Sequence, residues 1–395
     1  MPVPHASAVP VLALGGDNKN TFCVLIDDRA YLSQHLGDVG SLEGMENLVQ
    51  GVKSYCALLG VRPAVVGADL HPNYRSSKLA AQLAADFGAE RHPGVQHHHA
   101  HFASCLAENR VGGEAIGIIL DGTGYGRDGQ LWGFEVLCGS YLDFERVYHL
   151  APVPLPGGER AVRFPWITAL AYLETFLGES GRAAARRLFA GRQELYLVER
   201  LLASGFNISL ASSCGRLFDA VSAIIGVCQE NTFEGEAPVC LEALVPWYPA
   251  ASQPQDFHLR LEPYPYFFRK AEIDPGPLFE AILADIGCTE PSRVARRFHD
   301  TVIAMVREAA LKVRAQTGLK QVVLSGGSWQ NRYLLGVGRR ALQADGFTVF
   351  TQRLVPPGDG GLALGQAVVM AKQQAADARM QSTVGNAARS VAVGN

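Results

Sequence analysis

The chain has 395 residues, 48% of them hydrophobic and 18% charged, which suffices for one large domain or two ordinary ones. Its formal net charge of −3 and the absence of a dense Lys/Arg run argue against a nucleic-acid partner. It contains no apolar run of about eighteen residues that could span a membrane, and its N-terminus lacks the features of a secretory signal.

In chain order, the first residues predict strands that alternate with helices. Short strands are expected at 11–16 and 22–28, joined by a Gly/Asp/Asn turn, and a buried strand is expected at 64–70. Apolar residues spaced by three and four predict helices at 41–60 and 76–88, each ended by glycine.

The strand–turn–strand pattern starts again at residue 115. Residues 115–120 and 130–139 predict buried strands joined by a tight turn, DGTGYGRDG. The middle of the chain is mostly helical, and the end returns to strands and helices in alternation. The repeated pattern predicts two similar lobes, each built on a sheet covered by helices.

The expected boundaries follow from this repeat. The first lobe should comprise residues 1–114 and be joined by a C-terminal helix at 361–375. The second lobe should comprise 115–360, with a helical insertion at about 167–244. The small and polar residues 376–395 predict a flexible tail.

Glycine-rich turns end three of the expected strands. The turn in LDGTGYGRDG leads into a strand rather than a helix, so it does not fit the dinucleotide-binding fingerprint. Successive N–H groups in such a turn can still bind a phosphate, and LSGGSWQN places a further glycine turn before a helix. The Gly/Asp/Asn turn between the first two strands is the third. Three such turns around one cleft would form the nucleotide site of an actin-like, sugar-kinase-like fold. The alternative is three ordinary turns.

Four histidines lie within five positions at the start of an expected helix. His97 and His101 are four residues apart and share a helix face, which is metal-ligand spacing for zinc or iron. The alternative is a polar helix face, and His98 and His99 fit that description. Asp121 and Asp359 follow expected strands and are the best candidates for further ligands.

Eight motifs in order carry a resemblance to a known family: ALGGDNKNTFC, GADLHPNYRSS, VQHHHAH, LDGTGYGRDGQLWGFE, GRLFDAVSA, TFEGEAP, LSGGSWQN and GDGGLALGQA. They resemble the C-terminal, Kae1/TsaD-like carbamoyltransferase domain of HypF, a hydrogenase maturation factor. The resemblance covers Leu12 to Lys372. It implies a two-lobed α/β fold of the actin-like, sugar-kinase-like class.

The resemblance also implies an activity. The domain would transfer the carbamoyl group of carbamoyl-adenylate to the C-terminal cysteine of a HypE-like acceptor, as a step toward a cyanide ligand of the nickel–iron site. One zinc or iron ion would be held by His97, His101, Asp121 and Asp359. Lys19 and Asp121 would act in catalysis. The adenylate would lie against Lys19, Asn20, Gly122, Thr123, Gly124, Asp219, Glu236, Gly326, Gly327 and Asn331.

Several of these residues have simpler interpretations. A single lysine such as Lys19 is usually solvated, and acids in helical surroundings, such as Asp219 and Glu236, are usually on the surface. The chain also departs from the family pattern at Gly358, where Asn is usual, and at Ser328 and Trp329, where a small residue and Phe are usual. The larger side chains of Ser328 and Trp329 question substrate fit, and none of these departures removes a metal ligand.

Full-length relatives carry acylphosphatase, zinc-finger and YrdC-like modules ahead of this domain, and the YrdC-like module makes the adenylate. No such segment precedes Leu12, so we expect a short form supplied by a separate YrdC-like protein. The eight cysteines form no CxxC pair, and a reducing cytoplasm is the expected location.

Four other functions compete with this interpretation. The chain could be an O-carbamoyltransferase for a small-molecule hydroxyl, a tRNA-modifying relative, a non-catalytic nucleotide-binding subunit, or a kinase of the same fold. A tRNA enzyme should have a basic surface, and a kinase would not need the His-x-x-x-His pair.

Overall fold

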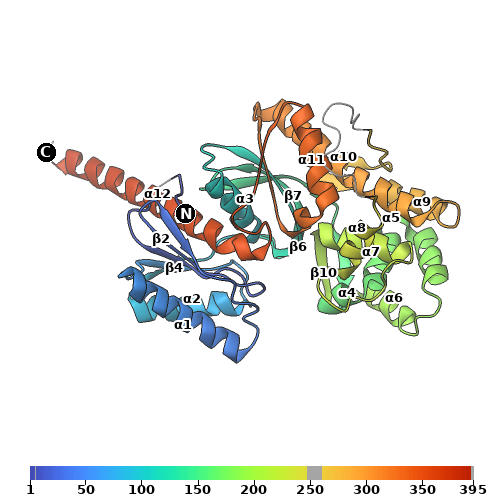
Figure 1. The fold of residues 1–395 in the computed structure, drawn as a ribbon, viewed down its shortest axis with the longest axis horizontal. Coiled ribbons are helices and arrows are strands. Elements are labelled where there is room, and N and C mark those ends of the chain that lie inside the picture. The colour runs from blue at the N-terminus through green and yellow to red at the C-terminus, as the bar shows by residue number, and fades with distance from the viewer. Residues whose placement is uncertain (5, 247–259, 393–395) are drawn as a thin grey trace. The chain divides into compact units, whose positions relative to one another are not determined.

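A computed structural model describes residues 1–4, 6–246 and 260–392, with side chains described as far as residue 380 (Figure 1). The chain divides into two compact units. The first unit comprises 1–114, 139–144 and 350–395, and the second comprises 115–138 and 145–349.

The first unit is built on a five-stranded sheet of order β3-β2-β1-β4-β5. β1 pairs antiparallel with β2 and parallel with β4, which pairs parallel with β5. The strands are β1 Val11–Ala13, β2 Cys23–Ile26, β3 Arg29–Leu32, β4 Val65–Gly67 and β5 Glu90–Arg91. The helices are α1 Leu42–Leu59, α2 Arg75–Phe87, α3 His97–Glu108, the short 3₁₀ turn η2 Asp359–Gly361 and α12 Leu362–Ala392.

A local cap accounts for the limits of α1, and a distant carboxylate supports the start of α2. The side chain of Ser41 accepts a hydrogen bond from the N–H of Gly44 and so caps α1, which ends at Gly60 with φ 64°. Asp17 accepts hydrogen bonds from the N–H groups of Arg75 and Ser76 at the start of α2. These contacts satisfy N–H groups that have no partner inside the helix.

α3 and α12 pack against each other over a long face (Figure 1). Every residue of α3 from His97 to Ala107 is buried. Gly365 of α12 lies so close to Ala100 that a Cβ there would collide with the Ala100 backbone. Glycine is therefore required for the approach of the two helices.

The second unit is built mainly on a nine-stranded sheet, in which β11-β12-β8-β7-β6-β13-β14 are neighbours and β10 pairs with β7 and β9. The strands are β6 Ala115–Tyr125, β7 Leu131–Gly139, β8 Phe144–Leu150, β9 Val153–Pro156, β10 Ile208–Ser213, β11 Phe267–Arg269, β12 Glu272–Asp274, β13 Gln321–Ser325 and β14 Thr348–Thr351. The helices are α4 Glu159–Arg163, α5 Pro165–Leu188, α6 Leu195–Ser204, α7 Cys214–Ile224, α8 Glu236–Ala243, α9 Gly276–Asp285, α10 Pro291–Thr317, the 3₁₀ turn η1 Gly327–Gln330 and α11 Arg332–Ala344.

The structure differs from the sequence-based boundaries in several places, and strand β10 lies inside the expected helical insertion. β6 continues to Tyr125, so the tight turn expected from residue 121 begins at Gly126, whose N–H donates to Gln130 O over 2.8 Å. Residues 139–144 and 350–360, expected in the second lobe, belong to the first unit. The segment expected as a tail from 376 continues α12 as far as Ala392, and 393–395 lie outside the described residues.

Among the described residues, no helix is both long enough and apolar enough to cross a membrane.

Candidate functional site

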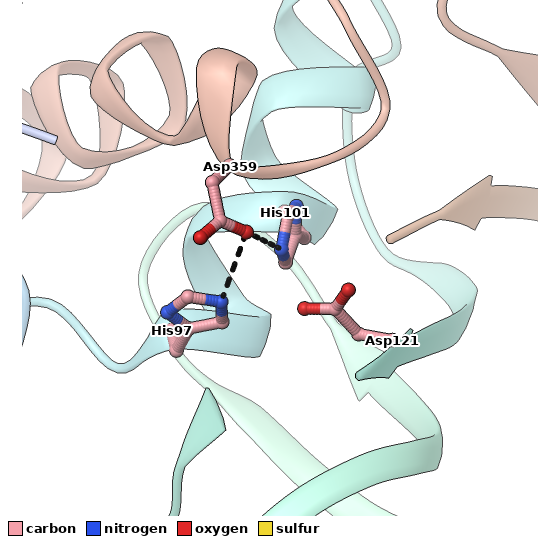
Figure 2. Close-up of side chains that lie close together, drawn as sticks. All are labelled: His97, His101, Asp121 and Asp359. Carbon is pink, nitrogen blue, oxygen red and sulfur yellow. Dashed lines mark ion pairs between the residues drawn. The ribbon is translucent and has the colours of Figure 1, made fainter. Parts of the chain in front are cut away.

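Three potential metal ligands lie together in the first unit. His97 and His101 are one turn apart on α3, and Asp359 begins η2 just before α12. The Oδ1 atom of Asp359 lies 3.8 Å from Nε2 of His97 and 3.9 Å from Nε2 of His101 (Figure 2). These separations are too long for hydrogen bonds, and they suit atoms that each lie about 2 Å from one shared ion.

The carboxylate of Asp69 orients the imidazole of His97. Nδ1 of His97 lies 2.8 Å from Oδ2 of Asp69, and neither side chain is exposed. With the Nδ1–H group donating to Asp69, Nε2 of His97 carries the lone pair that faces Asp359. Sequence reasoning did not select Asp69, although its position just after β4, inside the GADLHP motif, was a usable signal.

His98 and His99, the other two of the four histidines, are also buried, and they have other partners. Nε2 of His99 donates to the carbonyl oxygen of Ser140 over 2.8 Å, and its ring packs against Phe144 with centroids 4.9 Å apart. Nδ1 of His98 lies 3.4 Å from Nε2 of Gln96. His98 and His99, which fitted a polar helix face by sequence, are therefore buried residues with partners inside the first unit.

The turn that contains Lys19 lies beside Asp359 in the first unit. A Cβ on Gly16 would be 3.9 Å from Oδ2 of Asp359, and one on Gly360 would be 3.6 Å from the carbonyl oxygen of Lys19. Lys19 has a positive φ of 47° and an exposed side chain. The buried amide of Asn20 donates to the carbonyl oxygens of Leu14 and Gly16, over 2.8 and 2.5 Å, and so holds the turn together.

Two of the predicted glycine-rich segments meet in the second unit, where strand β13 ends beside its parallel neighbour β6. The N–H group of Gly327 donates to Oδ1 of Asp121 over 2.9 Å. Gly326 has a φ of 101°, and a Cβ there would collide with the backbone of Leu120. The carboxyl edge of parallel strands is the usual place for a ligand in an α/β sheet. Thr123 and Gly124 continue β6 from this point.

The start of α7 lies against the same segment. Ser213 caps α7 by accepting from the N–H of Arg216 over 3.1 Å, and its hydroxyl donates to the carbonyl oxygen of Gly122. A Cβ on Gly215 would be 2.9 Å from Cα of Gly122. Asp219 is fully buried, and its Oδ2 accepts from Nε of Arg216 over 2.6 Å. Burial raises the pKa of Asp219, and the positive charge of Arg216 opposes that rise.

Two further predicted ligand-binding residues have structural partners. Glu236 accepts hydrogen bonds from the N–H and the hydroxyl of Thr232, which lower its pKa. Oδ1 of Asn331 caps α11 by accepting from the N–H of Leu334, and its Nδ2 donates to Nε2 of His299, each over 2.9 Å. Both ends of the Asn331 amide are thus used inside the second unit.

We expect His299 to make the second unit sensitive to acid. It is fully buried, its Nδ1–H donates to the carbonyl oxygen of Ala295, and burial lowers its pKa to about 4. Because an unfolded histidine has a pKa near 6.5, the unfolded chain binds the proton first, and stability is lost as the pH falls from about 6.5 toward 4. The loss attributable to His299 should reach roughly 3 kcal/mol.

Urea unfolding of the wild type and of His299→Gln at pH 7.5 and 4.5 measures this loss. The variant should be less stable at pH 7.5 and should lose less on acidification. His35→Gln is the control, because His35 is exposed. An equal acid loss in wild type and His299→Gln would show that other groups cause it.

Comparisons with known proteins cover nearly the whole chain. The family described as "HypF Kae1-like domain" matches residues 6–108, and "Carbamoyltransferase, Kae1-like Domain, second subdomain" matches 117–366. The chain is 39% identical to Carbamoyltransferase HypF2 of Cupriavidus necator over 91% of this chain and 46% of that protein. It is 36% identical to a Carbamoyltransferase HypF homolog of the same organism over 93% of each chain.

Solved structures agree with these matches. A full-length HypF crystallised in a phosphate- and nucleotide-bound form has a TM-score of 0.85 and 36% identity, over 94% of this chain and 47% of that one. HypF of T. kodakarensis has a TM-score of 0.82 and 31% identity. The chain thus spans about half the length of these relatives and nearly all of the HypF homolog. The Kae1-like α/β fold that the resemblance implied is confirmed.

Proposed function

The chain belongs to the HypF carbamoyltransferase family, and from this we propose that it transfers a carbamoyl group in the maturation of nickel–iron hydrogenase. The donor would be carbamoyl-adenylate and the acceptor the C-terminal cysteine of a HypE-like protein. The observation that carries the proposal is the group formed by the buried His97 and His101 and the partly exposed Asp359, with Asp69 behind His97. A relative of matching length that is named a carbamoyltransferase supports it.

The cluster fits one zinc or iron ion. Two imidazoles and a carboxylate are a donor set for these metals, and a carboxylate hydrogen-bonded to the far side of a ligating imidazole is the usual support. We propose Asp121 as the fourth ligand on the strength of the family resemblance. When bound, the ion would supply a Lewis acid.

The reaction needs little covalent help from the protein. Carbamoyl-adenylate is a mixed anhydride, so the thiolate of the acceptor can attack the carbamoyl carbon directly while the bond to the phosphate oxygen breaks and AMP leaves. The thiol proton passes to solvent before attack. The protein has to hold the anhydride in place and stabilise negative charge, which positioned N–H groups and cations do well.

The residues of each unit suit one part of this task. In the first unit, the exposed Lys19 beside Asp359 would neutralise phosphate charge. In the second unit, we place the adenylate at the strand edge where the Gly326–Gly327 turn meets the Gly122 segment. The phosphate- and nucleotide-bound state of the solved HypF relative supports a nucleotide ligand.

The test is the mass of the C-terminal cysteine peptide of a HypE-like acceptor. We expect a gain of one carbamoyl group when the purified chain is supplied with a YrdC-like protein, carbamoyl phosphate and ATP, and a much slower gain without the YrdC-like protein. Asp359→Asn should lose at least about a hundredfold in rate, as removal of a key electrostatic group usually costs. Glu46→Gln, an exposed site on α1, is the matched control.

Three results would change the proposal. Full transfer by the chain alone from carbamoyl phosphate and ATP would mean that it also makes the adenylate. Modification of a small hydroxylated compound instead of the acceptor would indicate an O-carbamoyltransferase. Nucleotide and acceptor binding without any transfer would indicate a non-catalytic subunit. We expect the reaction in the cytoplasm, where the acceptor thiol stays reduced.

A further inference from the structure

An arginine at the start of α7 is almost completely buried but only partly used. The side chain of Arg216 is 6% exposed, and that of its partner Asp219 is not exposed at all. The Nε atom of Arg216 donates to Oδ2 of Asp219 over 2.6 Å. Burying a guanidinium without a partner is costly, so Asp219 accounts for the burial of the charge. It does not account for the outer end of the guanidinium.

The two terminal nitrogens of Arg216 remain available. In the described part of the chain, neither Nη1 nor Nη2 makes a hydrogen bond, and neither is among the fully enclosed polar atoms that lack a partner. They therefore reach the small accessible part of this side chain. A planar guanidinium fixed through Nε presents these nitrogens as a two-pronged donor, the arrangement that binds an oxyanion.

The position of Arg216 adds a second positive feature. It is in the first turn of α7, where backbone N–H groups have no partner inside the helix and the helix dipole favours an anion. Side chains in a helix lean toward its N-terminus, which directs Arg216 to the end capped by Ser213. The Tyr172 hydroxyl donates to the carbonyl oxygen of Ser213 over 3.4 Å. Burial raises the pKa of this phenol, and the positive charge of Arg216 opposes that rise.

The same helix end lies against the segment where an adenylate is expected. The Ser213 hydroxyl bonds the carbonyl oxygen of Gly122, and Gly215 packs against Cα of Gly122. Gly122 follows Asp121, which accepts from the N–H of Gly327. All of these residues belong to the second unit.

We propose that Arg216 and the N-terminus of α7 form an oxyanion site that binds the phosphate of the adenylate. Asp219 is then a positioning residue that holds the guanidinium, and the fully buried Asp219 does not itself meet the substrate. The choice of the adenylate phosphate, rather than another oxyanion, rests on the proposed function.

Binding of AMP and adenosine to the metal-loaded protein tests the site without any transfer reaction. By calorimetry, AMP should bind the wild type at least tenfold more tightly than adenosine, and inorganic phosphate should compete with AMP but not with adenosine. Arg216→Gln should weaken AMP on the order of 10–100-fold, the loss expected for charged hydrogen bonds, and change adenosine by less than about threefold. Asp219→Asn should weaken AMP less than Arg216→Gln does.

Two controls separate a binding role from a structural one. Arg160→Gln removes the same charge from an exposed arginine of the second unit and should leave both affinities unchanged. Arg216→Lys keeps the charge without the two-pronged geometry and should lose several-fold in AMP affinity. It serves as the deciding variant if Arg216→Gln does not fold.

The proposal is overturned if the wild type binds AMP and adenosine equally, or if the Arg216 variants keep the preference for AMP. Absence of carbamoyl transfer with an intact, Arg216-dependent preference for AMP would instead refute the proposed function and leave the oxyanion site standing.

Discussion

His97→Ala and His101→Ala should each lose nearly all of the bound metal. The wild type, purified without chelators, is expected to carry about one zinc or iron ion per chain, because its two imidazoles and the carboxylate of Asp359 suit these ions. Removal of either imidazole takes away one of the ligands that hold the ion. Metal per chain is measured by plasma mass spectrometry, and the expected value for both variants is below about a tenth of the wild type.

Variants of residues next to the ligands should lose metal affinity to different degrees. Asp69→Asn keeps the shape of Asp69 but weakens its hold on Nδ1 of His97, which should reduce metal affinity about 10–100-fold. His98→Gln should retain the metal, since this ring lies beside Gln96. Melting curves must show that each variant is folded. Equal metal loss from His97, His98 and His101 variants would mean a loose chelate in place of the defined cluster.

Gly365→Val should unfold or strongly destabilise the first unit. A side chain at position 365 would collide with the backbone of Ala100, so α12 and α3 would have to move apart. The residues of α3 around Ala100 are all buried, so this movement would disturb a packed region. Overpacking usually costs 1–3 kcal/mol, and a collision with backbone that cannot move aside should cost more than about 3 kcal/mol. Because α3 carries His97 and His101, metal binding should be lost together with stability. Urea unfolding followed by circular dichroism measures the change.

Gly336→Ala is the matched control for this prediction. Gly336 is exposed in the interior of α11, and a Cβ there meets nothing within 4 Å. The substitution should therefore stabilise the protein by up to about 1 kcal/mol through helix propensity. A Gly365→Val protein with wild-type stability and metal content would show that α12 does not pack on α3 as described.

Much of the local structure follows from sequence alone. Ser41 and Gly60 mark the ends of α1, and the four-residue spacing of His97 and His101 places both rings on one helix face because the helix repeats every 3.6 residues. Ordered motifs identify the family and with it the fold class. These features depend on near neighbours or on motif order, and neither requires knowledge of the packed chain.

Only the tertiary structure decides which distant groups meet. Asp359 comes beside His97 from 262 residues away, and Asp69 comes beside it from 28 residues away, through the packing of α12 and the end of β4 against α3. Periodicity carries no information on such contacts, so Asp69 went unselected.

Burial was decided in the same way. His98, His99 and Asp219 look like solvated residues of helix faces, yet each is enclosed because neighbouring elements cover all sides of α3 and α7. Whether Asp219 meets a ligand or positions Arg216 depends on which end of the ion pair reaches solvent. That is a property of the packed second unit, and local sequence does not contain it.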